Sequence, residues 1–261
     1  MEQAGPVLLV IAGVALVGFL VWYSHHLEQK RLEAFQRWAR GGSWSYRPDK
    51  RKDPGYAYEL FERGHSRYLQ HLAWKELEAP TPGLSAVKPA LFEYHYAVTT
   101  SNGKSTTTSH HYFSCLLIDP GLDLGNVELR REGLGDKLMQ AVGFDDIDPE
   151  DPEFSRRYVV KARRREDAYA LLDQAMMRFL TAFKAPSLTT RGRELLLFAD
   201  TKASPEVYES MARFMLRFLA QLPRPLVNAE RAARGLPPLV EAGNAAPESR
   251  AALEHFEGDR T

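Results

Sequence analysis

Two imidazoles and one carboxylate form the sharpest chemical candidate in this sequence. Glu93 and His95 lie two residues apart in the segment LFEYHY, and His110 lies in the segment TSHHYF that follows it. A hairpin between the two segments would place all three side chains on one face of a sheet. Two imidazoles with a carboxylate are a ligand set typical of zinc or another divalent metal. The sequence therefore predicts, as an alternative function, a metal-binding domain or metal-dependent hydrolase; polar pairs on an exposed sheet face are the competing interpretation.

The turn that would bring these residues together is marked by Asn102-Gly103. An Asn-Gly pair between β-branched and aromatic runs favours a two-residue type I′ turn. In that register the numbers of facing residues sum to 205, so that His95 faces His110. The Ser- and Thr-rich tip, residues 99–108, has nothing apolar to bury. We therefore expect the tip to project into water.

Other motifs for catalysis or cofactor binding are missing from the sequence. It has no GxSxG elbow, no dinucleotide fingerprint and no phosphate-binding loop. The acidic run from Asp146 has the first spacings of an EF-hand, but its sixth position is Asp151 and its twelfth is Arg157. Cys115, the single cysteine, lies in the apolar run CLLI, where a thiol is usually inert. The sequence thus predicts no catalytic residue and no cofactor, and it gives enzyme activity no positive support.

Hydrophobic periodicity predicts one α+β domain over residues 53–224. Its alternating segments indicate a mainly antiparallel sheet of about five to seven strands. Two long amphipathic helices, Arg165 to Phe183 and Ser204 to Leu222, are expected to cover one face of that sheet. Residues 225–261 are rich in Ala, Pro and charge, which is typical of a largely disordered tail.

An uncharged apolar run, Pro6 to Tyr23, precedes the domain. Its length matches the hydrocarbon core of a bilayer, so residues 6–23 are predicted to be a transmembrane helix with the lipid bilayer as a partner. Residues 24–52 form a basic stalk with eight Lys and Arg against three acids, whereas residues 1–5 carry no Lys or Arg. The positive-inside rule then predicts a single-pass protein of the bacterial cytoplasmic membrane. Residues 1–5 would be a short extracytoplasmic N-terminus, and the domain would lie in the cytoplasm.

Charge narrows the choice of partners. The 261 residues carry 34 Lys plus Arg against 34 Asp plus Glu, so the net charge is zero and nucleic acid is not indicated. The stalk favours contact with anionic lipid at four basic positions, if it is more than a topology signal. These positions are Lys30, Arg31, Arg37 and Arg40.

Two short motifs resemble a known group of proteins. Phe92, Tyr94 and Tyr96 make an FxYxY pattern, and an F-x-R-x-Y-x-V pattern over residues 154–160 precedes a helix that opens near Asp167-Ala168. After an apolar run and a basic stalk, this order resembles bacterial single-span membrane-anchored proteins of unknown function. The resemblance covers about residues 20–222 and implies a membrane anchor and no known activity; the Pro-rich insertion at residues 79–90 and the long tail depart from it.

The projecting polar tip and the lack of catalytic motifs add to this expectation. Together they predict a non-catalytic interaction or scaffold module at the cytoplasmic face of a bacterial membrane, with an unknown protein partner.

Overall fold

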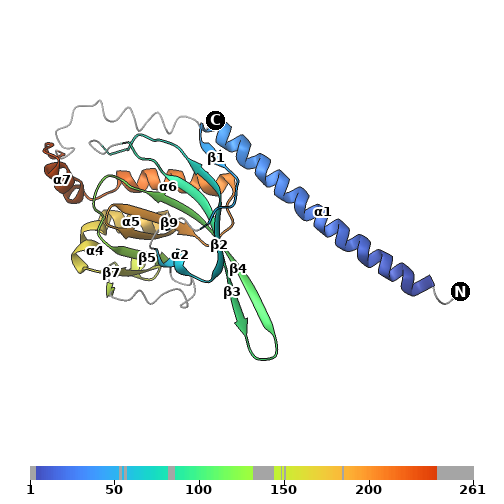
Figure 1. Ribbon diagram of the computed structural model, residues 1–261. Coiled ribbons are helices and arrows are strands. Elements are labelled where there is room, and N and C mark those ends of the chain that lie inside the picture. Colours follow the sequence, from blue (N-terminus) through green and yellow to red (C-terminus); the bar gives the residue numbers. More distant parts are fainter. Residues whose placement is uncertain are drawn as a thin grey trace.

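The computed structural model describes residues 4–52, 55, 58–81, 86–131, 144–147, 149, 151–183 and 185–239, with side chains from Ala12 onward. Within these residues nine strands form one sheet, in the order β1-β2-β3-β4-β9-β8-β5-β7-β6, and all neighbouring strands are antiparallel (Figure 1). The strands are β1 Ser45–Arg47, β2 His65–Trp74, β3 Ala90–Ser101, β4 Thr106–Ile118, β5 Val127–Arg131, β6 Asp145–Ile147, β7 Tyr158–Ala162, β8 Ser187–Arg191 and β9 Glu194–Ala199. The helices are α1 Ala4–Gly41, α2 Glu59–Glu62, α3 Pro152–Ser155, α4 Arg165–Leu171, α5 Gln174–Ala182, α6 Pro205–Ala220 and α7 Arg224–Ala233.

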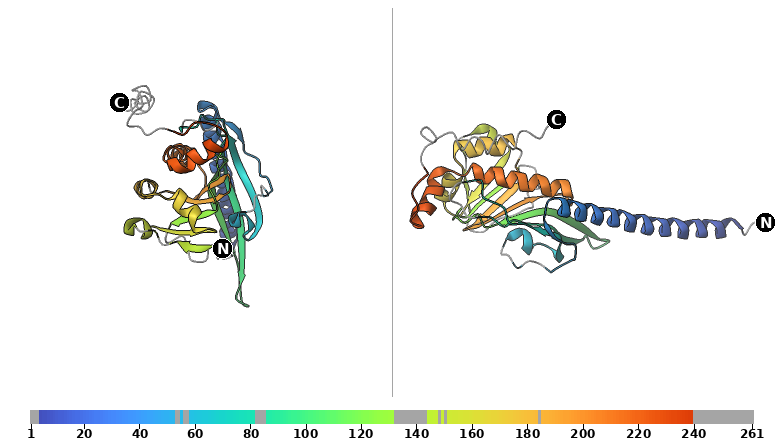
Figure 2. Two further views of the ribbon diagram at one scale, coloured as in Figure 1. Left: turned by 90° about the vertical axis from the view of Figure 1, so that its left-hand side faces the viewer. Right: turned by 90° about the horizontal axis from the view of Figure 1, so that it is seen from above.

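The two faces of the sheet bury separate apolar clusters, because successive strand residues point to opposite faces. On one face, Leu91, Leu116 and Leu197 pack with side chains of α5 and α6. On the other face, Phe92 and Tyr94 pack with the short helix α2. Figure 2 shows this layering, with α4, α5 and α6 on one side of the sheet and α2 on the other. The sheet is therefore covered by helices on both faces, and it has more strands than the five to seven predicted.

One of the two predicted long helices is interrupted. The segment predicted as one helix from Arg165 to Phe183 forms α4 and α5, separated at Leu172 and Asp173. The Asp173 carboxylate accepts a hydrogen bond from the Met176 amide at 2.7 Å and so caps a new helix. The second helix is continuous: Ser204 caps α6 and Pro205 takes the first helical position.

The β3–β4 hairpin has a different turn from the predicted one. Its facing residues sum to 207, with Ser101 opposite Thr106, so the loop is Asn102 to Ser105 instead of a two-residue turn. The Asn102 side chain accepts hydrogen bonds from the amides of Lys104 and Ser105, which stabilises the longer loop. The strands continue past the rest of the sheet and the hairpin projects from it (Figure 1), as expected for the polar tip.

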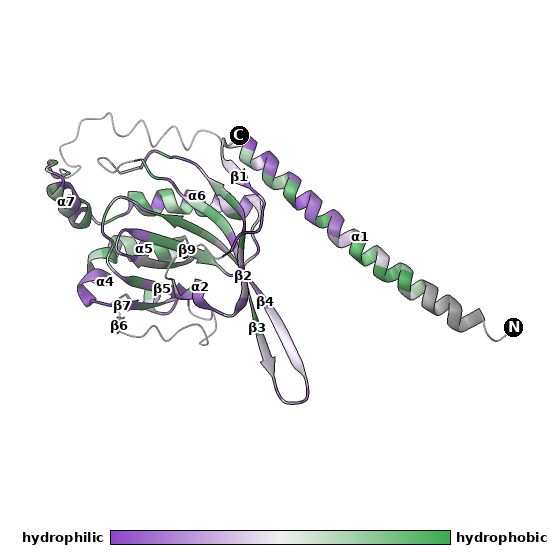
Figure 3. Ribbon diagram, in the orientation of Figure 1, coloured by the Kyte–Doolittle hydropathy of each residue, from purple (hydrophilic) through white to green (hydrophobic). Residues whose placement is uncertain are grey.

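Helix α1 is a long helix whose C-terminal part packs on the domain and whose N-terminal part stands away from it (Figure 1). Figure 3 shows that the coloured part of α1 farther from the domain is mostly hydrophobic and the part nearer the domain mostly hydrophilic. Among the residues whose side chains are described, no helix is long and apolar enough to cross a bilayer.

This finding contradicts three predictions: the transmembrane helix over residues 6–23, the single-pass topology and the location in the bacterial cytoplasmic membrane. Within the predicted stalk, residues 24–41 continue α1 onto the domain, where Phe35 and Ala39 are buried. Helix α7 lies at the start of the predicted tail and buries Val227. Residues 240–261 of that tail lie outside the described residues.

Candidate functional site

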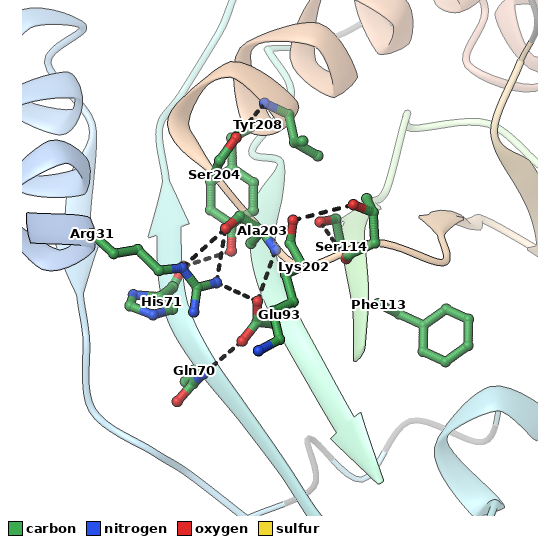
Figure 4. A network of polar contacts seen from close by, with 12 residues as sticks. Arg31, Gln70, His71, Glu93, Phe113, Ser114, Lys202, Ala203, Ser204 and Tyr208 are labelled. Carbon is green, nitrogen blue, oxygen red and sulfur yellow. Dashed lines mark hydrogen bonds and ion pairs between the residues drawn. The ribbon is translucent and has the colours of Figure 1, made fainter. Parts of the chain in front are cut away.

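Glu93 of β3 is a fully buried carboxylate at the junction of the sheet, α1 and the loop between β9 and α6 (Figure 4). Its Oε1 accepts a hydrogen bond from Gln70 Nε2 at 2.6 Å. Its Oε2 accepts from the Ala203 amide at 2.7 Å and forms an ion pair with the guanidinium of Arg31. A buried charge is tolerated only when it is paired and hydrogen-bonded, and here every neighbour of Glu93 is a donor. The carboxylate is saturated by the protein itself.

Arg31 joins α1 to two other elements at once. Besides Glu93, its guanidinium donates to the Ala203 carbonyl from Nη2 at 2.8 Å and from Nε at 3.2 Å. This site orients the long helix on the sheet, because a planar guanidinium fixes direction as well as distance. The predicted lipid contact of Lys30, Arg31, Arg37 and Arg40 is not supported: Arg31 faces the domain, and Arg40 Nε donates to the Gln36 carbonyl.

An aromatic layer surrounds this ion pair. Phe35 of α1 is fully buried, and its ring lies 4.6 Å from the His71 ring and 5.2 Å from the Tyr208 ring. Burial lowers the pKa of His71 to about 4, so the imidazole is neutral at neutral pH. Burial also raises the pKa of Tyr46, so the phenol keeps its proton, and its oxygen lies within hydrogen-bond distance of His71 Nδ1 at 2.7 Å. The junction is thus neutral apart from the Arg31–Glu93 pair.

The predicted metal ligands are only partly brought together. The actual register differs by two residues from the predicted one, so His95 faces Tyr112 and His110 faces Ala97. An even shift keeps each side chain on its face, and the two histidines therefore meet diagonally, with His95 Nε2 3.0 Å from His110 Nδ1. Burial lowers the pKa of His95. Its Nδ1 lies 3.1 Å from the Ser66 carbonyl, so Nδ1 carries the proton and Nε2 accepts from His110.

Glu93 does not complete this pair, because its carboxylate is occupied by Arg31, Gln70 and Ala203. Within the described part of the chain, no group of three His, Cys, Asp or Glu side chains is placed to hold a metal ion. Cys115 is buried, and burial raises the pKa of its thiol. The metal function stays a prediction. Of its three predicted ligands, the structure places two side by side, the imidazoles of His95 and His110.

Part of β4, residues 106–113, is paired with a strand on one side only among the described residues, a feature that the sequence interpretation missed. The Leu69 amide and carbonyl bond to Arg51, on the side of β2 away from β3. In an antiparallel ladder hydrogen-bonded and non-bonded pairs alternate, so Tyr94 and Phe113 bond to each other. The β3–β4 ladder has no register shift. It follows that the amides and carbonyls of β4 at Thr106, Thr108, His110 and Tyr112 point away from β3.

Strand β9 bonds to this side of β4 only from Ser114 to Ile118. Over Thr106–Phe113, which we name the open edge, β4 has no second strand among the described residues. At about 3.4 Å per residue the open edge is about 27 Å long, enough for a strand of ordinary length.

The open edge lacks the features by which proteins usually protect sheet edges. Such edges are kept short or carry charges, proline or bulges. The outermost strands of this sheet, β1 and β6, follow that rule with three residues each. The sequence TTTSHHYF of the open edge has no charged residue, no proline and no bulge. Its only signal in the sequence is length: β4 has 13 residues, whereas its neighbour β9 has six.

No family model matches the sequence, and no curated protein matches it. The crystal structure of the mycobacterial trehalose monomycolate transport factor A is similar, with a TM-score of 0.48 and 13% sequence identity. The similarity covers 80% of this chain and 97% of that chain. Nothing about the function of this chain follows at that level, and the resemblance to bacterial single-span proteins stays a prediction.

Proposed function

We propose that the protein is a non-catalytic interaction module that binds an extended segment of a partner protein along the open edge of β4. The observation that carries this proposal is an unprotected run of main-chain donors and acceptors on a hairpin that projects from the sheet. Adding a strand to such an edge is a general mode of peptide recognition, in which main-chain hydrogen bonds supply the affinity.

The rest of the domain is suited to hold this edge rigid. The inner end of β4 is buried from Phe113 to Ile118, and from Ser114 to Leu117 it is paired on both sides, with β3 and with β9. Ser114 Oγ donates to the Thr201 carbonyl at 3.1 Å and so fixes the chain where β9 ends. A pre-organised edge costs little ordering entropy on binding, which favours recognition of a flexible segment.

The experiment uses a displayed library of random twelve-residue peptides, selected on the immobilised full chain. Enriched peptides are synthesised, and their affinities are measured for the wild type and two proline variants. Thr108→Pro removes an outward amide of the open edge, and Thr99→Pro is its matched control. Thr99 is the residue opposite Thr108, and its amide points to the other side of the hairpin. Both changes leave the β3–β4 hydrogen bonds intact and lose the same Thr99–Thr108 hydroxyl contact of 2.9 Å.

We expect Thr108→Pro to weaken binding by about ten-fold, because one main-chain bond is lost and the ring crowds the incoming strand. Thr99→Pro should have little effect. Amide exchange gives an independent signature: a bound peptide should slow exchange at Thr106, Thr108, His110 and Tyr112 and leave the residues between them unchanged. Failure to select any peptide, or equal losses for the two variants, would refute the proposal. Concentration-dependent pairing of two copies through β4 without peptide binding would also refute it.

A further inference from the structure

Two lysines lie on the face of the sheet that carries His95 and His110. Lys202 stands over Tyr112 at the inner end of the open edge, and Lys50 stands over Tyr68 of β2, two strands away from β4. Lys202 Nζ lies 4.4 Å from the centre of the Tyr112 ring, and Lys50 Nζ lies 4.6 Å from the centre of the Tyr68 ring. The two ammonium groups come from different loops, and both are exposed. Among the described residues neither has an ion-pair partner.

The open edge itself is poor in negative charge. No Asp or Glu occurs from Tyr94 to Ile118, and Lys104 at the hairpin tip is the only formal charge in that range. Four acids lie near the lysines: Glu93 is paired with Arg31, Asp49 beside Lys50 is paired with Arg51, Asp200 lies on the same loop as Lys202, and Glu28 acts on Tyr68 from α1. Lys104 and Lys202 outnumber Asp200, the one acid beside the edge, so the field there is positive.

Tyr68 and Tyr112 provide a polar group between the lysines. Burial first, and hydrogen bonding to Tyr112 in addition, raise the pKa of Tyr68 to about 12. Ammonium and phenol groups are hydrogen-bond donors, and a carboxylate accepts from both.

A strand added along the open edge would put alternate side chains on this face, next to Tyr112 and His110. We infer that the bound segment is acidic and that an Asp or Glu side chain opposite Tyr112 is held by Lys202, with Lys50 contributing from above Tyr68 on β2, two strands away from β4. This inference rests on the proposed function and specifies the chemistry of the segment.

The test uses the peptides selected on the full chain. They should carry Asp or Glu at one position of the alternating set. Lys202→Gln should weaken their binding between about 1.5- and 5-fold, as expected for an exposed ion pair, and Lys50→Gln should weaken it less. Lys88→Gln is the matched control, because Lys88 is also exposed but precedes the opposite end of β3. Replacing the acidic residue of the peptide by its amide should abolish the effect of Lys202→Gln, and added salt should weaken binding by the wild type.

The outcomes separate the two proposals. Peptides that are sensitive to Thr108→Pro but are not acidic, and that bind Lys202→Gln and Lys88→Gln equally, would overturn this inference and leave the proposed function standing. Selection of no peptide would overturn both. Acidic peptides that are sensitive to Lys202→Gln but not to Thr108→Pro would show a charged surface without strand addition and would refute the proposed function.

Discussion

The buried pair between Arg31 and Glu93 makes a prediction whose size can be worked out. Replacing Arg31 by Met keeps most of the side-chain volume but removes the cation beside a fully buried carboxylate. The carboxylate would keep two neutral or backbone donors, from Gln70 and from the Ala203 amide. Removing one partner of a buried ion pair typically costs about 3–5 kcal/mol, because the other charge stays buried without compensation.

The carboxyl can escape this penalty by binding a proton. Glutamic acid has a reference pKa of about 4.3, so protonation costs about 1.36 kcal/mol for each pH unit above that value. The penalty is therefore limited to about 3.7 kcal/mol at pH 7 and about 1 kcal/mol at pH 5. In the folded variant the Glu93 carboxylate binds a proton more readily than in the unfolded chain. The stability of the variant therefore falls as the pH rises above about 4.3. The wild type lacks this loss.

Urea unfolding of both proteins at pH 5 and pH 7 measures the effect. The destabilisation by Arg31→Met should be larger at pH 7 than at pH 5 by about 2–3 kcal/mol. Glu93→Gln supplies the matched background, since it keeps the shape of the side chain and cannot ionise. In the Glu93→Gln background, Arg31→Met should lower the free energy of unfolding by about 1–2 kcal/mol, because the bonds to the Ala203 carbonyl are lost. This cost should be the same at pH 5 and pH 7. The reasoning fails if the cost of Arg31→Met is the same at both pH values, or if the Gln background leaves its pH dependence unchanged.

Three further predictions concern the same junction and the base of the hairpin. Because burial lowers the pKa of His71 from 6.5 to about 4, the unfolded chain binds more protons in that window. The wild type should thus lose up to about 3 kcal/mol as the pH falls from about 6.5 to 4. His71→Asn, which suits the left-handed backbone at φ 54°, should reduce this loss in pH-dependent unfolding. Phe35→Ala should cost about 3–5 kcal/mol in urea unfolding, because Phe35 is fully buried among His71, Tyr46 and Tyr208; a cost below about 1 kcal/mol would mean that α1 is not docked as described. Gly64→Ala should lower the midpoint of thermal unfolding, since φ is +56° and a Cβ there would lie 2.2 Å from the Ala97 carbonyl oxygen; an unchanged midpoint would contradict this contact.

The hairpin shows which parts of the fold were accessible from the sequence. Alternation of apolar and polar residues fixes only whether a residue points to one face or the other. It therefore placed Glu93, His95 and His110 on one face. The turn fixes the register, and Asn-Gly is compatible both with a two-residue turn and with the loop from Asn102 to Ser105 that forms here. The two registers differ by two residues, so the faces were predicted correctly and the pairing of His95 with His110 was not.

Glu93 could be identified as unusual from the sequence, but its partner could not. A carboxylate within LFEYHY must be buried with its strand, and a buried carboxylate needs a cation or a metal. The metal interpretation considered only nearby ligands, whereas the cation comes from Arg31, 62 residues earlier in the chain. Arg31 in turn was assigned to a basic stalk, because its contact with the sheet depends on where α1 docks, and periodicity in one helix does not specify its partner.

The open edge was inaccessible for a related reason. An unpaired edge depends on two neighbouring strands. The open edge exists because β9 ends at Ala199, opposite Ser114, whereas β4 extends beyond that pair as far as Thr106. Each strand taken alone reads as an ordinary β segment, and nothing in TTTSHHYF indicates that its outer side is unpaired. Once β9 is placed, the lack of charge and proline in that run becomes informative, because an unprotected edge favours association. A partner strand would pair the main-chain groups that the open edge leaves unpaired. For this reason we assign function to the edge of β4 and not to the histidine pair beside it.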